Sequence, residues 1–387
     1  MARLGDLCRF INGDRGKNYP SQAEISSDGD VPFINAGHLV DGKLDFSDMN
    51  YISEEKYNQL NSGKIQENDV LYCLRGSLGK KAIIKGISKG AIASSLVIIR
   101  PDARLINSDY LFYALESPTV QEQMMQANNG SSQPNLSAKS VSDYTFNLPT
   151  INKQCEIVLK LAKVNDLISL RKEQLAKLDQ LVKSRFIELF GMPGTDTNGW
   201  GLIPLGEVCQ INPKKGQDKR LASGLTVSFV PMPAVSEKGE IDPSDTREYD
   251  AVKTGFTYFA ENDVLFAKIT PCMENGKGAV ARGLYNGIGF GSTEFHVLRP
   301  INGKTNPYWI YMLTAFSQFR EDAANNMTGS AGQRRVPASF LESYRVSVPP
   351  IELQEQFAAF VEQTDKSKLA IQQSLDKLEL LKKSLMQ

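Results

Sequence analysis

The amino-acid sequence predicts a mixed α/β (α+β) fold that is built twice, with a long helix after each copy. Three observations lead to this prediction. Similar strings recur in the same order about 200 residues apart, short β-branched runs alternate with turns, and two stretches of about 40 residues have helical periodicity. The repeat is the strongest of the three signals.

The repeated strings run through both copies. LGDLC from Leu4 returns as LGEVC from Leu205, and ENDVL begins at both Glu67 and Glu261. LVIIRP and FHVLRP, then LPTINKQ and VPPIELQ, continue the correspondence. Matches in one order with little drift indicate a tandem duplication. We therefore divide the chain into a mixed domain, a helix, a second mixed domain and a second helix, at residues 1–150, 151–191, 192–349 and 350–387.

Short β-branched or aromatic runs bounded by Gly, Pro and Asp predict the strands of each domain. The expected strands are Val31–Asn35, Val70–Leu74, Ala82–Ile84 and Leu96–Ile99, then Val227–Val230, Val264–Ala267, Gly278–Ala281 and Phe295–Leu298. A helix should follow each Arg-Pro pair. Asp109 is expected to start the first one, and Asn306 with Pro307 at the first helical position should start the second.

The two long helices begin after Pro149 and Pro349 and carry apolar residues at heptad spacing. At 1.5 Å per residue each is a rod of about 60 Å, longer than one domain needs, so we predict that the helices pair as a coiled coil. The alternative is that each helix packs only on its own domain. The predicted interface residues are Leu161, Ile168, Leu175, Leu178, Val182, Ile371, Leu375 and Leu378.

Composition excludes several classes of protein. Lys+Arg and Asp+Glu both number 44 in the 387 residues, so any nucleic-acid surface must be a local patch. No apolar run is long enough for a membrane span, and the first residues do not resemble a signal peptide. The 5 cysteines are scattered without a CxxC pair, which fits a reducing cytoplasm. The 2 histidines, His38 and His296, leave few candidates for catalysis or metal binding.

Several strings resemble catalytic or cofactor motifs but lack an essential part. GIGFGS from Gly287 is followed by a predicted strand, whereas a dinucleotide-binding loop needs a helix there. NPYW from Asn306 is interpreted as a helix cap, and GSLGKK and ENGKG do not complete a phosphate-binding loop. We therefore predict no catalytic residues, no metal site and no cofactor bound by this chain.

Two elements in each copy favour contact with DNA. The stretch from Val70 to Pro101 contains lysines and arginines but no acidic residue, and a Gly-Ser loop follows later in both copies. Basic side chains neutralise phosphates, and Arg, Asn and Gln can read base edges. Solvated strand edges and plain turns are the alternatives. The predicted DNA contacts are Arg75, Lys80, Lys81, Ser131 and Gln133 in the first copy, and Lys268, Asn275, Lys277, Ser330, Gln333, Arg334 and Arg335 in the second.

With two such copies, each followed by a spacer helix, the chain resembles the specificity (S) subunit of a type I restriction–modification enzyme. The most specific string is FAKITPCMENGKGA from Phe266, and PPIELQEQ at the start of the second helix is also typical. The first copy is a more divergent version of the same pattern.

The resemblance implies two target-recognition domains, 1–150 and 192–349, that each read one half of an interrupted DNA sequence. The two helices would pair antiparallel about a pseudo-two-fold axis, set the spacing and dock two methyltransferase subunits, which motor-nuclease subunits then join. S-adenosylmethionine, ATP and Mg would belong to those partners. Two other functions stay open: an adaptor that binds only proteins, and a stand-alone DNA methyltransferase or nuclease.

Overall fold

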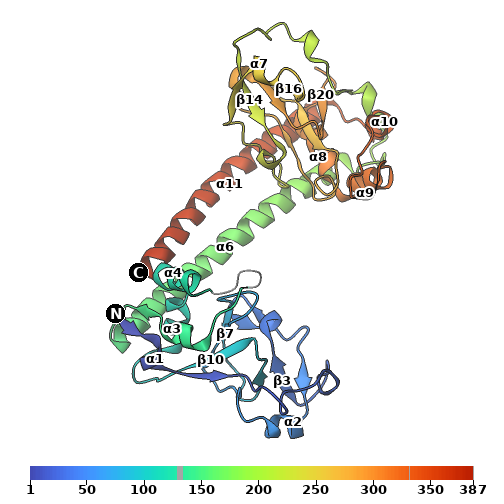
Figure 1. Ribbon diagram of the computed structural model, residues 1–387. Coiled ribbons are helices and arrows are strands. Elements are labelled where there is room, and N and C mark those ends of the chain that lie inside the picture. The colour runs from blue at the N-terminus through green and yellow to red at the C-terminus, as the bar shows by residue number, and fades with distance from the viewer. Residues whose placement is uncertain (129–133, 331, 387) are drawn as a thin grey trace. The chain divides into compact units, whose positions relative to one another are not determined.

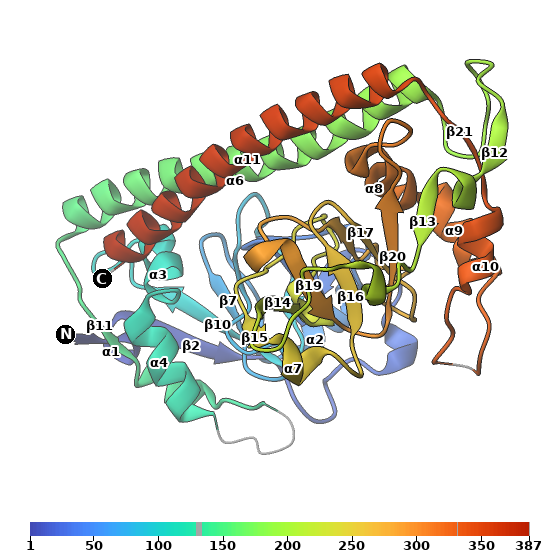
Figure 2. The ribbon, with the colours of Figure 1, turned by 90° about the horizontal axis from the view of Figure 1, so that it is seen from above.

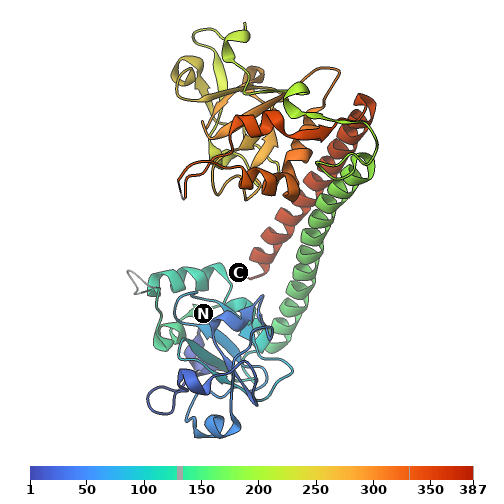
Figure 3. The ribbon, with the colours of Figure 1, turned by 90° about the vertical axis from the view of Figure 1, so that its right-hand side faces the viewer.

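The computed structural model describes residues 1–128, 134–330 and 332–386, and its contacts divide the chain into two units. Unit 1 comprises Met1–Lys172 and Gln373–Gln387, and unit 2 comprises Glu173–Gln372. Each unit therefore contains a globular part and a segment of each long helix, α6 (Ile151–Phe190) and α11 (Ile351–Leu385) (Figure 1). Both ends of the chain belong to unit 1, where Figure 3 marks them.

Unit 1 is built on a four-stranded sheet of order β2-β10-β7-β8, with a three-stranded sheet β6-β3-β9 and two pairs, β1-β11 and β4-β5. Its strands are β1 Ala2–Arg3, β2 Cys8–Asn12, β3 Val31–Ile34, β4 Leu39–Val40, β5 Lys43–Leu44, β6 Tyr51–Ile52, β7 Val70–Cys73, β8 Lys81–Ile83, β9 Ala91–Ile92, β10 Leu96–Pro101 and β11 Thr145–Phe146. Its globular part has the α-helices α1 Leu4–Leu7, α2 Glu54–Gln59, α3 Ser108–Ala114, α4 Pro118–Ala127 and α5 Ala138–Ser142.

Unit 2 repeats this plan with a four-stranded sheet of order β13-β20-β17-β18, a second four-stranded sheet β15-β14-β19-β16 and a pair, β12-β21. Its strands are β12 Leu202–Pro204, β13 Cys209–Ile211, β14 Thr226–Val230, β15 Thr246–Glu248, β16 Thr257–Ala260, β17 Val264–Ala267, β18 Gly278–Val280, β19 Ile288–Gly291, β20 Phe295–Pro300 and β21 Arg345–Ser347. Its globular part has the α-helices α7 Tyr249–Val252, α8 Pro307–Ala315, α9 Ser317–Asn325 and α10 Ala338–Ser343.

The mixed helix and strand architecture confirms the predicted fold class, and each predicted strand is found within a few residues of its expected bounds. All four residues of β7 and of β17 are buried, because helices cover one face of the sheet and further strands and loops cover the other. In unit 1 the helix on that face is α3, beside β7 and β8 (Figure 2). The start of α3 differs from the prediction. Its cap is Asn107, whose side chain accepts hydrogen bonds from the amides of Asp109 and Tyr110.

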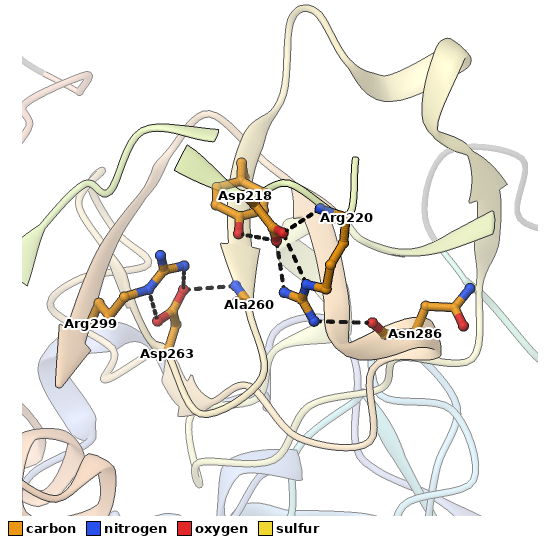
Figure 4. A network of polar contacts seen from close by, with 7 residues as sticks. Asp218, Arg220, Ala260, Asp263, Asn286 and Arg299 are labelled. Atoms are coloured by element: carbon orange, nitrogen blue, oxygen red, sulfur yellow. Dashed lines mark hydrogen bonds and ion pairs between the residues drawn. The ribbon is translucent and has the colours of Figure 1, made fainter. Parts of the chain in front are cut away.

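A buried ion pair explains why ENDVL and Arg-Pro recur. Asp69 binds Arg100 through two contacts of 2.8 Å in unit 1. Asp263 binds Arg299 at 2.8 and 2.7 Å in unit 2, where Figure 4 shows it beside the Asp218–Arg220 pair. The hydrogen bonds to Asp263 raise the pKa of Arg299. Each pair joins the start of one central strand to the end of its neighbour with bidentate geometry.

One buried glutamine at the start of each long helix explains the shared Pro-x-x-x-x-Gln pattern. The Gln154 side chain accepts from the amide of Asn107 at 2.8 Å and donates to the carbonyls of Leu105 and Pro149. Gln354 makes the same three bonds with Asn306, Lys304 and Pro349. Both side chains are 0% exposed, so each amide is fully satisfied and ties its helix to the first turn of α3 or α8.

Segments of α6 and α11 lie side by side within each unit (Figures 1 and 2). In unit 1 the Lys172 Nζ lies 3.8 Å from Glu379, and in unit 2 the Lys368 Nζ lies 2.7 Å from Asp179. The ring of Phe357 packs against Phe186 in unit 2. Four of the predicted interface residues are buried and four are half-buried: respectively Leu161, Ile168, Val182 and Leu375, and Leu175, Leu178, Ile371 and Leu378.

We expect Gln354→Leu to lower the free energy of unfolding by at least about 2 kcal/mol, since it leaves one buried amide and two buried carbonyls unpaired. Chemical denaturation of the full chain measures this loss. Glu355→Ala, at an exposed position one residue further along α11, is the control and should change stability by a few tenths of a kcal/mol. Equal effects of both substitutions would contradict the role given to Gln354.

Candidate nucleic-acid interface

In both units, the two elements predicted to contact DNA lie against each other. In unit 2 the loop Lys268–Lys277 follows β17, and the amides of Thr270 and Val336 pair with the carbonyls of Arg334 and Lys268 at 3.1 and 2.9 Å. In unit 1 the loop after β7 meets the segment that leads to α5. Gly76 donates to Pro134 at 3.2 Å and Leu136 to Leu74 at 2.8 Å. Segments some 60 residues apart in sequence thus form one surface in each unit.

The predicted residues of unit 2 are distributed over this surface. Asn275, Ser330, Gln333 and Arg334 are exposed, and Lys268 and Lys277 are half-buried. The Lys277 Nζ points to the Met232 carbonyl at 3.4 Å, and Arg334 lies 3.9 Å from Glu274. Their contacts with DNA stay a prediction.

Arg335 has a structural partner. It binds Glu294 through contacts of 2.8 to 3.2 Å, while its backbone pairs with Thr328 to close the hairpin. These hydrogen bonds raise the pKa of Arg335 and lower that of Glu294. Arg335 therefore braces the segment that carries Gln333 and Arg334. Because its guanidinium is bound to Glu294, it is less available for DNA than these two neighbours.

In unit 1, Arg75 is exposed and borders a depression of about 350 Å³. Asn12, Arg15 and Asn135 also line it, and none of the three was among the predicted DNA contacts. A signal for Asn12 was present, because Ile11-Asn12 recurs as Ile211-Asn212 at the end of β2 and β13, two strands that were not predicted. Ser131 and Gln133 lie outside the described residues.

The basic stretch from Val70 to Pro101 is mostly neutralised by acidic residues from other parts of unit 1. The pairs are Lys81 with Glu116, Lys85 with Asp109, Lys89 with Glu54 and Arg100 with Asp69. Among the residues that the structure describes, Arg75 and Lys80 have no carboxylate within 4.0 Å. Of the basic face predicted in this stretch, Arg75 and Lys80 are therefore the side chains left without a carboxylate partner in the described part of the chain.

Lys81 corrects the predicted set of DNA contacts. Its side chain is 7% exposed, and its Nζ lies 3.0 Å from Glu116 and 4.4 Å from the ring centre of Phe112. Glu116 also binds Lys382 of α11 at 3.1 Å. Burial lowers the pKa of Lys81, and although burial alone would raise the pKa of Glu116, the two ammonium groups lower it. Lys81 thus helps to dock the end of α11 in unit 1 and is not free to meet a phosphate.

His296 connects β20 to the hairpin of unit 2. Its Nε2 lies 2.8 Å from the Val336 carbonyl, which can only accept, so Nε2 carries the proton. Nδ1 then accepts from the Asn212 side chain at 3.0 Å, while the Asn212 oxygen accepts from the amide of Val297. Burial lowers the pKa of His296, which keeps the ring neutral and the bond to Val336 intact. His296 is therefore a packed residue of unit 2.

Two glycines of GIGFGS serve packing. Gly289 and Gly291 lie in strand β19, where a Cβ on Gly289 would meet the ring of Phe259 at 2.1 Å and one on Gly291 the Val230 carbonyl at 2.2 Å. Across the described part of the chain, no three His, Cys, Asp or Glu side chains are grouped as a metal site would require. No helix in that part has the length and apolar character needed to cross a membrane.

Comparisons with known proteins follow the duplication. The sequence matches the family model of the "Type I restriction modification DNA specificity domain" twice, over residues 1–180 and 197–380. Two relatives from Escherichia coli are the type I restriction enzyme EcoEI and EcoAI specificity subunits, which are 41% identical over 155 residues and 39% identical over 161 residues. These matches cover 39% and 41% of this chain, and 25% and 26% of the relatives, so they span about a quarter of each relative's length.

A solved chain resembles the fold over 100% of this chain and 95% of its own length, with a TM-score of 0.62 at 18% identity. That structure concerns the complex assembly and conformational transition of the type I restriction–modification system. At this level of identity the likeness shows a common fold.

We expect His296 to make unit 2 less stable in mild acid. Below the ordinary pKa of 6.5 the unfolded chain takes up a proton that the buried ring resists, so the free energy of unfolding falls by up to about 1.4 kcal/mol per pH unit. Above that pH both states hold a neutral ring and the term vanishes. His296→Val, which places there the residue of the equivalent Val97, should flatten the stability profile between pH 7 and 5. An unchanged slope by chemical denaturation would contradict this role.

Proposed function

Because the chain belongs to the family of type I restriction–modification DNA specificity domains, we propose that it is the non-catalytic DNA-recognition subunit of such a complex. In this proposal each unit reads one half of a bipartite target. The observation that carries it is the meeting of the same two loops in both units. The framework of the site is shared, but Arg75 and Asn135 of unit 1 correspond to Ile269 and Arg335 of unit 2. Different side chains on one framework suit the reading of two different half-sites.

We propose that α6 and α11 form an antiparallel coiled coil that sets the distance between the half-sites and relates the two units by a pseudo-two-fold axis. The ion pairs in each unit and the buried seam residues support this pairing. The same glutamine bond fixes the first turn of α6 and of α11 to its own globular part. A pseudo-two-fold axis requires that both helices leave their globular parts in the same way.

We also propose that the outer face of α6 docks methyltransferase subunits. Leu159, Leu170 and Leu181 are 65%, 54% and 48% exposed, and a spacing of 11 residues places them on one side of the helix. Apolar side chains held in a row in water favour a protein partner. S-adenosylmethionine, ATP and Mg would act on the methyltransferase and motor-nuclease subunits.

Replacing residues 205–349 with the same segment of a relative should change one half of the methylated sequence and leave the other half and the spacing unchanged. The reason is that the loops of unit 2 rest on strands and helices within that segment. Methylome sequencing of cells that carry the hybrid subunit with its methyltransferase measures the outcome. A change in both halves would overturn the assignment of one half-site to each unit.

Removing the two charges of the Val70–Pro101 stretch that have no carboxylate partner among the described residues, with Arg75→Gln and Lys80→Gln, should weaken binding of the assembled complex to every duplex. The slope of log affinity against log salt should become shallower by about 1 per lost phosphate contact. Lys85→Gln with Lys89→Gln is the matched control, since both lysines already pair with carboxylates. If the control alters the slope as much as the test pair, Arg75 and Lys80 are not phosphate contacts. A change in sequence preference at constant slope would make them base readers.

A further inference from the structure

Arg320 of helix α9 is a buried cation without a counter-ion. Its residue is 6% exposed, and one guanidinium nitrogen, Nη1, donates to the Met273 carbonyl at 2.5 Å. The other two nitrogens, Nε and Nη2, have no hydrogen-bond partner among the residues described, and no carboxylate of that part of the chain lies within 4.0 Å. Burial lowers the pKa of Arg320 to about 10, so it is still charged at neutral pH.

Such a group costs stability. Desolvating a guanidinium and leaving two of its donors unpaired is unfavourable, and an apolar side chain of similar size is often more stable in such a place. The ring of Phe266, centred 5.2 Å away, gives only partial compensation. Fold stability alone therefore does not explain Arg320.

The equivalent place in unit 1 contains a buried cation that is neutralised. By strand register Lys81 corresponds to Gly278, where a Cβ would lie 3.5 Å from Nη2 of Arg320. Lys81 has Glu116 beside it, whereas the one hydrogen-bond partner of the Arg320 side chain among the described residues is the Met273 carbonyl. The hydrogen bond to the Met273 carbonyl thus gives Arg320 a specific contact with the loop that an apolar core residue could not make.

Met273 lies in the turn that carries Asn275, a predicted DNA contact of unit 2. Its carbonyl also accepts from the amide of Gly276 at 3.0 Å, and its side chain is 0% exposed. Glu274 and Asn275, in the same turn, are exposed. The guanidinium therefore holds the buried side of this turn, while Glu274 and Asn275 on its other side face solvent.

We propose that Arg320 is a positioning residue that holds the Lys268–Lys277 loop in its reading conformation and thereby sets the specificity of the half-site read by unit 2. The second part rests on the proposed function, and the first part stands on the contacts alone. Arg320 itself touches no DNA in this proposal.

The test uses Arg320→Met in the full chain, because methionine has similar length and no unpaired donors. We expect an unchanged or higher midpoint of thermal unfolding and amide exchange at Asn275 and Gly276 at least about tenfold faster, as for the loss of a bond from a charged donor. In the complex with methyltransferase, discrimination against single mismatches should fall about tenfold, but only in the half-site of unit 2. Arg320→Lys, which keeps a charged donor, should restore part of both effects.

Arg345→Met is the matched control, since Arg345 donates to the Leu202 carbonyl on β12 and not to the loop. It should leave loop exchange and both half-sites unchanged. A lower unfolding midpoint with equal weakening of both half-sites would make Arg320 a general structural residue and overturn the proposal, as would unchanged loop exchange. Because exchange is measured without DNA, failure of the wild-type complex to recognise any sequence would count against the proposed function and not against the bond to Met273.

Discussion

The architecture depends on one buried side-chain amide at the start of each long helix. Gln154 and Gln354 each pair with one backbone amide and two backbone carbonyls at that corner. Only a primary amide offers one acceptor and two donors on so short a stem. Because the first turn of the helix is fixed to the cap of α3 or α8, the direction in which α6 or α11 leaves its globular part is fixed as well.

The duplication separates what supports the fold from what varies on it. The Asp–Arg pair between the central strands and the amide at the helix start occur in both units with the same atoms and nearly the same distances. The loops that follow β7 and β17 share only their backbone bonds. In unit 1 an exposed arginine, Arg75, borders an open depression, while in unit 2 Arg335 and Glu294 brace a hairpin. A shared framework with loops that differ allows one fold to present different binding surfaces.

Much of this could be predicted from the sequence, because periodicity and repeats report local structure. The central strands, the cap at Asn306 and the start of both long helices were evident, whereas β2 and β13 were missed because each begins within a repeated string that was not interpreted as a strand. Charge was harder to predict. Lys81 stands in a stretch without acids, yet Glu116 reaches it from 35 residues away. Arg320 gave no signal at all, since its environment is made by a strand, a helix and a loop that are distant in sequence.

Each unit has a buried cation at the equivalent place, but Lys81 and Arg320 come from different elements, and this limits how the two copies can recombine. In unit 1 the charge comes from strand β8, and in unit 2 it comes from helix α9, with Gly278 leaving room for it. Recombination between the two copies within a globular part would bring together strand β8 with helix α9, or strand β18 with helix α4. The first hybrid would bury two cations, and the second would bury none and would leave Glu116, which precedes α4, with one of its two ammonium partners. Crossovers between this strand and this helix are therefore disfavoured, whereas exchange of a whole globular part keeps each buried cation in its own surroundings.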